Sequence, residues 1–148
     1  MPKPVRPPIG LQLSRTARSV SRAFDDALAE AGGSLPVWLV LISLKSQEPD
    51  NQRDLARAVG IREATLTHHL NAMESQALVT RRRDPANRRV HLVELTEAGE
   101  AAFIRLRDAA MAFDQRLRRG FSEDEIAGLG SLLGRLEANV ADGHDAYP

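Results

Sequence analysis

Two short helical segments on either side of a glycine constrain the fold of this chain more than any other feature. The first, "QRDLARAV", follows Asn51, whose side chain suits the N-cap of a helix, and it stops at Gly60. The second follows after a short turn and extends from about Glu63 to Gln76. Two short helices joined by a tight turn that contains glycine are the helix-turn-helix pattern.

The stretch after these helices alternates between apolar and polar residues, as half-buried β-strands do. Two alternating runs, "LVTRRR" and "RVHLVEL", flank the tetrapeptide "DPAN", whose residue types favour a turn. The pattern predicts a β-hairpin with an arginine-rich tip. Asp84 begins the turn and can pair with Arg88 across it, which would hold that arginine in place.

Apolar residues at helical spacing predict two helices before this central segment. The first begins at Ile9 and makes about five turns before it ends at Gly32 and Gly33. The second starts near Pro36, a residue that suits the first turn of a helix, and continues to about Ser46. This second helix is apolar nearly all round, so it should be buried.

Two more helices are predicted after the hairpin. Thr96 can cap the first of them, which ends at Gly120 and has apolar residues in a coiled-coil-like repeat. Ser122 and Glu125 have the spacing of a capping box and open the last helix, which has an apolar stripe of its own. The two stripes consist of Phe103, Leu106, Ala110, Phe113 and Leu117, and of Ile126, Leu129, Leu133, Leu136 and Val140.

The apolar stripes of the first and last helices are too extensive to be buried fully within one small monomer. One interpretation is that they pack only on the central module. We favour the other, a dimer interface that both ends of the chain build together.

The composition restricts the remaining possibilities. A chain of 148 residues suits one domain or one compact unit of closely packed parts. It contains no cysteine, which excludes disulfides, thiolate catalysis and thiol redox sensing. The longest apolar run, "VWLVLISL", is far shorter than a bilayer span, and the N-terminal segment lacks the apolar region of a signal peptide. We therefore expect a cytoplasmic protein without a membrane partner.

Charge is distributed unevenly along a chain whose formal net charge is zero. Between Arg53 and His91 there are eight arginines and four acids, a local excess of four positive charges. A basic island of this kind in a neutral chain indicates an anionic partner such as nucleic acid. The arginines are Arg53, Arg57, Arg62, Arg81, Arg82, Arg83, Arg88 and Arg89.

At about 100° per residue, the second helix of the helix-turn-helix pair separates into two faces. Leu66, Leu70 and Met73 lie on the core face, and His69 lies at its border. His68 points away from the core. Its neighbours on the outward face have short side chains: Ala64, Thr65, Thr67, Asn71 and Ser75.

The two adjacent histidines do not have the geometry of a metal site or of a catalytic pair. Neighbouring helical positions diverge by about 100°, whereas metal-binding pairs use a spacing of three or four residues. A general base would need a nucleophile, an orienting group and a pocket, and this face supplies none of them. We expect His69 to be structural, no metal or other cofactor to be bound, and the protein not to be an enzyme.

The outward face suits close approach to DNA. In the major groove, threonine and alanine can contact a thymine methyl group, Asn71 can pair with adenine, and His68 can donate or accept a hydrogen bond. Arg62, at the start of the helix, can reach a phosphate or a guanine. In the hairpin, Arg81–Arg83 can neutralise phosphates, and guanidinium groups at the tip can enter a narrow minor groove. The alternative for both elements is an ordinary solvated surface.

Together these elements resemble the MarR family of winged helix-turn-helix transcription regulators over nearly the whole chain. The densest match runs from Asp54 to Gly99. Within it, Met73–Glu74 stands at the leucine–glutamate pair of the family pattern, and Ala77–Val79 stands at a "GLV"-like segment. Asp84–Arg89 matches the wing, and Leu95–Gly99 matches the motif L-T-x-x-G.

Two positions depart from the family pattern. Asn87 stands where the wing commonly has a second acid, which can loosen the brace on the wing arginines. His68 stands where arginine is common, and histidine makes shorter contacts. The family's usual base preference therefore cannot be transferred to this chain.

The resemblance implies a mainly α protein with a small β-hairpin wing, in which the N- and C-terminal helices form a dimerisation domain. Together with the patterns above, it assigns residues 1–8 to a flexible arm and 143–148 to a frayed tail. Residues 9–35 and 97–142 would form the helical dimerisation region. Residues 36–96 would form the winged helix-turn-helix DNA-binding domain.

The resemblance further implies a homodimer whose two winged modules bind successive major grooves of a near-palindromic operator in double-stranded DNA. Such regulators usually repress a neighbouring operon or their own gene, and many respond to small anionic aromatic ligands. Candidate ligand-binding residues are Arg15, Arg18, Arg22 and Trp38. Arginines on one helix are also an ordinary solvated face, and Trp38 is expected in the core. The competing function is a winged-helix module that binds proteins without binding an operator.

Overall fold

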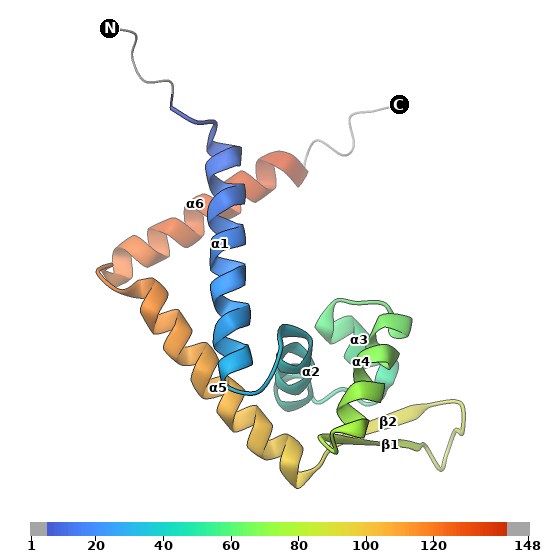
Figure 1. Ribbon diagram of the computed structural model, residues 1–148. Helices are drawn as coiled ribbons and strands as arrows, with labels where there is room; N and C mark the ends of the chain where they lie inside the picture. The colour runs from blue at the N-terminus through green and yellow to red at the C-terminus, as the bar shows by residue number, and fades with distance from the viewer. Residues whose placement is uncertain (1–5, 142–148) are drawn as a thin grey trace, which may run out of the picture. The chain divides into compact units, whose positions relative to one another are not determined.

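The computed structural model describes residues 6–141, and that part of the chain forms six helices and one hairpin in the predicted order (Figure 1). The predicted tail at 143–148 and the first five residues of the predicted arm lie outside the described residues. The chain divides into two compact units, residues 1–111 and 112–148. The elements are α1 Ile9–Glu30, α2 Leu35–Ser46, α3 Gln52–Val59, α4 Glu63–Ser75, β1 Val79–Arg83, β2 His91–Leu95, α5 Glu97–Arg118 and α6 Glu123–Ala141.

Several helices begin and end at the capping residues and glycines that the sequence predicts. The side chain of Asn51 accepts a hydrogen bond from the backbone of Asp54 at 3.0 Å and caps α3, which ends at Gly60 with a φ of 81°. Thr96 caps α5 by accepting from the backbone N–H of Gly99 at 3.0 Å. The first helix, α1, has 22 residues and is about one turn longer than predicted.

The first unit has a continuous core around α2. Trp38 is only 8% exposed and stacks on Phe103 of α5, with ring centroids 5.9 Å apart and an interplanar angle of 14°. The prediction that α2 is largely buried is confirmed. The fully or nearly buried apolar residues of this core are Leu28, Trp38, Val40, Leu41, Leu55, Ala56, Leu66, Leu70, Met73, Val79, Ala102 and Leu106.

A close approach of two backbones explains the glycine in the segment "LTEAG". Gly99 lies in the first turn of α5, directly against the carbonyl oxygen of Leu78. A Cβ atom at this position would overlap that oxygen, and backbone atoms cannot swing aside as a flexible side chain can. The glycine therefore lets α5 start immediately beside the strand that follows α4.

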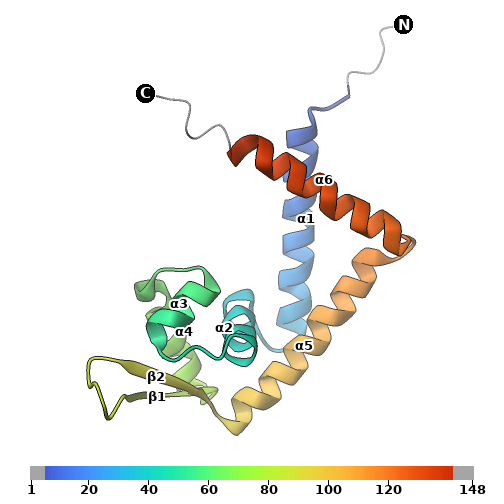
Figure 2. The same ribbon diagram turned by 180° about the vertical axis from the view of Figure 1, so that it is seen from behind.

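The hairpin pairs antiparallel, with Val79 opposite Leu95 and Arg83 opposite His91. Val79 is buried in the core, while the distal residues of the hairpin are mostly exposed. Both views show the hairpin extending past α3 and α4 into open space (Figure 1, Figure 2). The predicted wing is confirmed, and its base is fixed by the core while its tip is free of it.

The second unit contains the end of α5 and the whole of α6. The capping box predicted at Ser122 is present, because Ser122 Oγ accepts from the Glu125 backbone at 3.1 Å and Glu125 Oε1 accepts from the Ser122 backbone at 2.9 Å. The apolar stripe on α6 is largely exposed in the described part of the chain. Its exposed members are Leu129, Leu133 and Val140, and Leu132 and Phe121 are exposed beside it.

No single helix between residues 6 and 141 is both long and apolar enough to cross a membrane. The bent pair α1 and α2 reaches that length and composition only when its two helices are taken together.

Candidate nucleic-acid interface

A hydrogen bond between side chains fixes the two helices of the helix-turn-helix pair relative to each other. Gln52, the first residue of α3, donates from Nε2 to Oγ1 of Thr67 in α4 at 2.7 Å. The same hydroxyl donates to the carbonyl oxygen of Glu63 at 2.9 Å. Gln52 was not predicted to take part in the site, because nothing in its local sequence points to a partner 15 residues away.

The predicted outward face of α4 is exposed in the structure. Leu66, Leu70 and Met73 are fully buried, whereas His68 is exposed and His69 is half-buried. Thr67 is half-buried and its hydroxyl is already bonded within the protein, and its contact with DNA stays a prediction. The residues that remain exposed on the predicted face are Arg62, Ala64, Thr65, His68, Asn71 and Ser75.

The two histidine rings lie near each other without converging on a common point. Their centroids are 5.8 Å apart and the ring planes are tilted by 59°. In the described part of the chain, no group of three or more His, Asp or Glu side chains is placed to hold a metal ion. His68 therefore lies on the exposed face as an individual polar side chain.

Arg81 connects the first strand of the wing to α4. Its guanidinium group donates to Oε2 of Glu74 at 3.1 Å and also to Oδ1 of Asn71, and its side chain is only 18% exposed. The hydrogen bond and the positive charge of Arg81 lower the pKa of the Glu74 carboxyl group. The contact of Arg81 with a phosphate stays a prediction, and its guanidinium group already has two partners in the protein.

The other two arginines of β1 are also bonded within the hairpin. Arg82 pairs with Glu94, which lies diagonally across the two strands, at 2.9 Å. Arg83 donates to the carbonyl oxygen of Arg88 at 3.1 Å. These two bonds hold the hairpin, but unlike Arg81 both side chains remain exposed at its surface.

The predicted pair of Asp84 and Arg88 does not form. Oδ1 of Asp84 instead accepts from the backbone N–H of Ala86 at 2.9 Å, in an Asx turn. Asn87 makes the corresponding bond two residues on, accepting from the Arg89 backbone at 3.2 Å. A short side chain beside a turn reaches the nearest backbone N–H more readily than a long side chain that must be ordered.

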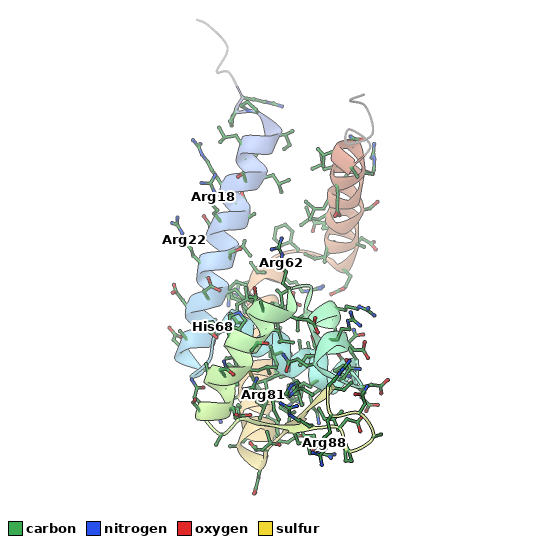
Figure 3. All side chains as sticks on the ribbon, turned by 90° about the vertical axis from the view of Figure 1, so that its right-hand side faces the viewer. Arg18, Arg22, Arg62, His68, Arg81 and Arg88 are labelled. Atoms are coloured by element: carbon green, nitrogen blue, oxygen red, sulfur yellow. The ribbon has the colours of Figure 1, made fainter. Side chains whose placement is uncertain are left out.

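Arg88 and Arg89 consequently make no side-chain ion pair with any residue between 6 and 141. Both are exposed in the loop of the hairpin. The same holds for Arg62, at the N-terminal end of α4, and for Arg53, in the first turn of α3. Figure 3 shows Arg62 at one end of α4, His68 farther along that helix, and Arg88 on the hairpin.

The four candidate ligand-binding residues do not share one environment. Trp38 faces the core and its ring packs on Phe103, whereas Arg15, Arg18 and Arg22 are exposed along α1. Figure 3 shows Arg18 and Arg22 projecting from α1, well away from the hairpin. Arg18 folds back along its own helix and donates to Oγ of Ser14 at 3.1 Å.

Sequence reasoning missed the cations around Phe103. Lys45 lies 5.7 Å and Arg107 6.0 Å from the centre of the ring, and Lys45 also pairs with Glu100 at 3.0 Å. Arg107 lies one helical turn after Phe103 on α5, whereas Lys45 comes from α2 and reaches the ring only through tertiary packing.

Comparison with known proteins decides the family. The MarR family model matches residues 34–91, which include α2, the helix-turn-helix pair and most of the hairpin. The crystal structure of the transcriptional regulator PA3341 shares 30% sequence identity, with a TM-score of 0.70, over 91% of this chain and 99% of that one. The chain belongs to the MarR family.

Another MarR-like structure is that of CouR, a transcriptional repressor bound to a 23-mer DNA duplex. It is 27% identical, with a TM-score of 0.77, over 88% of this chain and 92% of that one. CouR from Rhodococcus jostii RHA1 has also been crystallised with p-coumaroyl-CoA; that structure is 26% identical, with a TM-score of 0.69, over 86% and 90% of the two chains. The MarR fold therefore extends over nearly the whole of this chain.

Proposed function

We propose that this protein is a dimeric, sequence-specific DNA-binding regulator of transcription, in which α4 enters the major groove and the hairpin reaches the adjacent minor groove. One observation carries the proposal. An exposed helix face of short polar side chains lies beside a hairpin whose loop arginines have no ion-pair partner among the described residues. Short side chains allow close approach to base edges, and free guanidinium groups suit a narrow groove of high negative potential.

Within this function, the roles of the site residues follow from their surroundings. His68 would contact a base edge, and Asn71 would do so through its Nδ2 group, because its Oδ1 already accepts from Arg81; Ala64 and Thr65 are available for apolar contact. Arg62, Arg88 and Arg89 would contact phosphates or the minor groove. Arg81, together with Asp84 and Thr67, would hold these elements in position, whereas Arg82 and Arg83 make exposed bonds within the hairpin.

The proposal includes a homodimer built from the two ends of the chain. Ile9, Leu11 and Leu13 are exposed on α1, and the stripe on α6 is exposed as well. Exposed apolar residues repeated along two helices favour a shared interface over a solvated surface. Residues 9–35 and 97–142 would then serve dimerisation and residues 36–96 DNA binding, although residue 142 lies outside the described part.

The proposal also includes repression that a small ligand relieves. CouR, a relative of known structure, binds p-coumaroyl-CoA, which contains an aromatic acyl group. A ligand shifts such an equilibrium only by its differential affinity for the DNA-competent and DNA-incompetent conformations. The candidate residues for contact with an anionic aromatic ligand are Arg15, Arg18 and Arg22 on α1, with Trp38.

The test is a fluorescence-anisotropy titration of the gene's own upstream region, repeated at several salt concentrations. For six or more phosphate contacts, affinity should fall by about 10³ or more between 50 and 200 mM salt. Sedimentation at micromolar concentration should give about twice the 16.2 kDa mass of the chain. Salt-insensitive or absent binding to every upstream fragment would contradict the proposal and would favour the alternative, a winged-helix module that binds proteins.

A further inference from the structure

The side-chain amide of Asn71 is held at one end by the protein. Its Oδ1 accepts a hydrogen bond from Nη2 of Arg81, while Nδ2 donates to no residue between 6 and 141. A guanidinium group carries donors and no acceptor, so it can face only the oxygen end of an amide. The contact therefore fixes which way the amide is turned and leaves Nδ2 as the end that is available on the exposed face of α4.

Arg81 is itself held in place, unlike a mobile surface arginine. Its Nε donates to Oε2 of Glu74 at 3.1 Å, and its side chain is only 18% exposed. Asn71 and Glu74 are three residues apart on α4, so they are neighbours on one face of the helix. Figure 3 shows Arg81 where the hairpin meets α4. The three side chains form one hydrogen-bonded group that does not have to be ordered when a ligand arrives.

The fixed amide changes which base Asn71 can read. The usual pairing of asparagine with adenine uses both ends of the amide: Oδ1 accepts from the N6 amino group and Nδ2 donates to N7. Here the amino group of adenine would have to share Oδ1 with a cationic donor that already occupies it. Guanine presents two acceptors instead, N7 and O6, and both suit the Nδ2 donor. We infer that Arg81 makes Asn71 select guanine over adenine.

This inference rests on the proposed function and assigns Arg81 a role that DNA contact alone does not include. Arg81 acts through the amide of Asn71 and needs no contact with a base to do so. Its effect is on the ratio of affinities for two duplexes that differ in one base pair. A wing that is merely displaced would weaken binding to both duplexes alike, so the ratio isolates the orientation of the amide from the position of the wing.

The experiment measures this ratio by fluorescence anisotropy. Its probes are short duplexes of the upstream sequence that the wild type binds, with one base pair changed at a time. At the position that Asn71 reads, the wild type should bind the guanine duplex about fivefold or more tightly than the adenine duplex, which is the lower end for one well-placed base contact. Arg81→Ala should reverse the preference toward adenine, because Oδ1 can then accept from the N6 amino group.

Further variants separate the amide from the fold. Asn71→Ala identifies the position, because it should abolish the preference there, and Arg81→Ala added to it should not change the ratio again. Arg81→Lys keeps a cation that only donates and should keep guanine preferred. The control, Arg82→Ala with Glu94→Ala, removes another pair that involves β1 and should leave every ratio unchanged. Thermal unfolding of each variant checks that the fold is retained.

The role of Arg81 would be overturned by three results that leave the proposed function intact. The first is a wild type that prefers adenine at the position that depends on Asn71. The second is a ratio that Arg81→Ala leaves unchanged, with both duplexes bound more weakly to the same extent, since Arg81 would then only hold the wing. The third is the absence of any position whose preference depends on Asn71. A wild type that binds no duplex would contradict the proposed function itself.

Discussion

The wing contains two groups of arginines that the sequence presents as one. In the strand, Arg81, Arg82 and Arg83 all donate to acceptors within the protein. In the loop, Arg88 and Arg89 use only backbone atoms for internal bonds, and their side chains make no ion pair among the described residues. The two groups are separated by only four residues.

The difference follows from where acceptors are available. Neighbouring strands bring diagonal side chains on the same face within reach of each other, so Arg82 can pair with Glu94. In the loop, the acceptors of Asp84 and Asn87 are occupied by backbone N–H groups. A tight loop thus satisfies its own backbone with its short side chains and leaves its long cationic side chains to solvent or to a partner.

The largest expected effect on DNA affinity comes from removing one of the loop arginines. Arg88→Ala should weaken DNA binding by about tenfold to a hundredfold, as expected for a charged hydrogen bond, with little change in Tm. The matched control is Arg82→Ala with Glu94→Ala, which removes a strand pair at constant net charge. Anisotropy titration should place this control within about twofold of the wild type. Equal losses of DNA affinity in Arg88→Ala and in the double variant would mean that the loop and strand arginines do not differ in their contribution to binding.

The fold was predictable from sequence because its decisive signals are local. Asn51 and Gly60 delimit α3, Thr96 begins α5, and Ser122 with Glu125 begins α6. Each signal lies within a few residues of the boundary it sets, so no tertiary information is needed to recognise it. The division of α4 into buried and exposed faces was predictable for the same reason, since helical geometry fixes it.

The partners of the site residues were not predictable in the same way. Thr67 meets Gln52 from 15 positions away, and Arg81 meets Asn71 from ten positions away. Such bonds depend on how the helices and the wing pack and on which rotamer a long side chain adopts. The basic island contains eight arginines, and the structure separates those that are bonded to another described residue from those that are not.

Removing Arg81 tests the strand arginines, and we expect it to have the next largest effect. Arg81→Ala deletes both bonds between β1 and α4, so Tm should fall by a few degrees. DNA affinity should fall as well, because the wing would no longer be held against the recognition helix. Calorimetry and anisotropy on the same samples measure the two losses. Arg88→Ala should lower affinity alone, and a similar Tm loss in both variants would contradict the distinction.

A substitution at the base of the wing, Ala77→Gly, should change the stability of the fold without changing any charge. Ala77 has a φ of 58° in the Schellman-type end of α4, where Leu78 N–H donates to the Met73 carbonyl at 2.9 Å. Ala77→Gly should raise the free energy of unfolding by about 1 kcal/mol, because glycine adopts this conformation without steric cost. Urea denaturation measures it, and the salt slope of DNA binding should not change. Gly60→Ala should destabilise the protein, because alanine would be strained at the φ of 81° that Gly60 adopts.

The smallest expected effect is the pH dependence of the Arg81–Glu74 pair. Arg81 lowers the pKa of Glu74 in the folded protein, so folding favours the deprotonated carboxylate. The resulting stabilisation is fully present above the unfolded pKa of glutamate, about 4.3, and is lost as pH falls through the lowered folded value.

Glu74→Gln should therefore be less stable than the wild type at pH 7, and the difference should shrink as the solution is acidified. Urea denaturation from pH 7 to pH 3 measures it, in the wild type and in the Arg81→Ala background. The pH-dependent difference should disappear in that background, because the carboxylate loses the group that lowers its pKa. A difference that persists without Arg81 would mean that another group stabilises Glu74, and the strand arginine would then be less tightly coupled to α4 than its two bonds indicate.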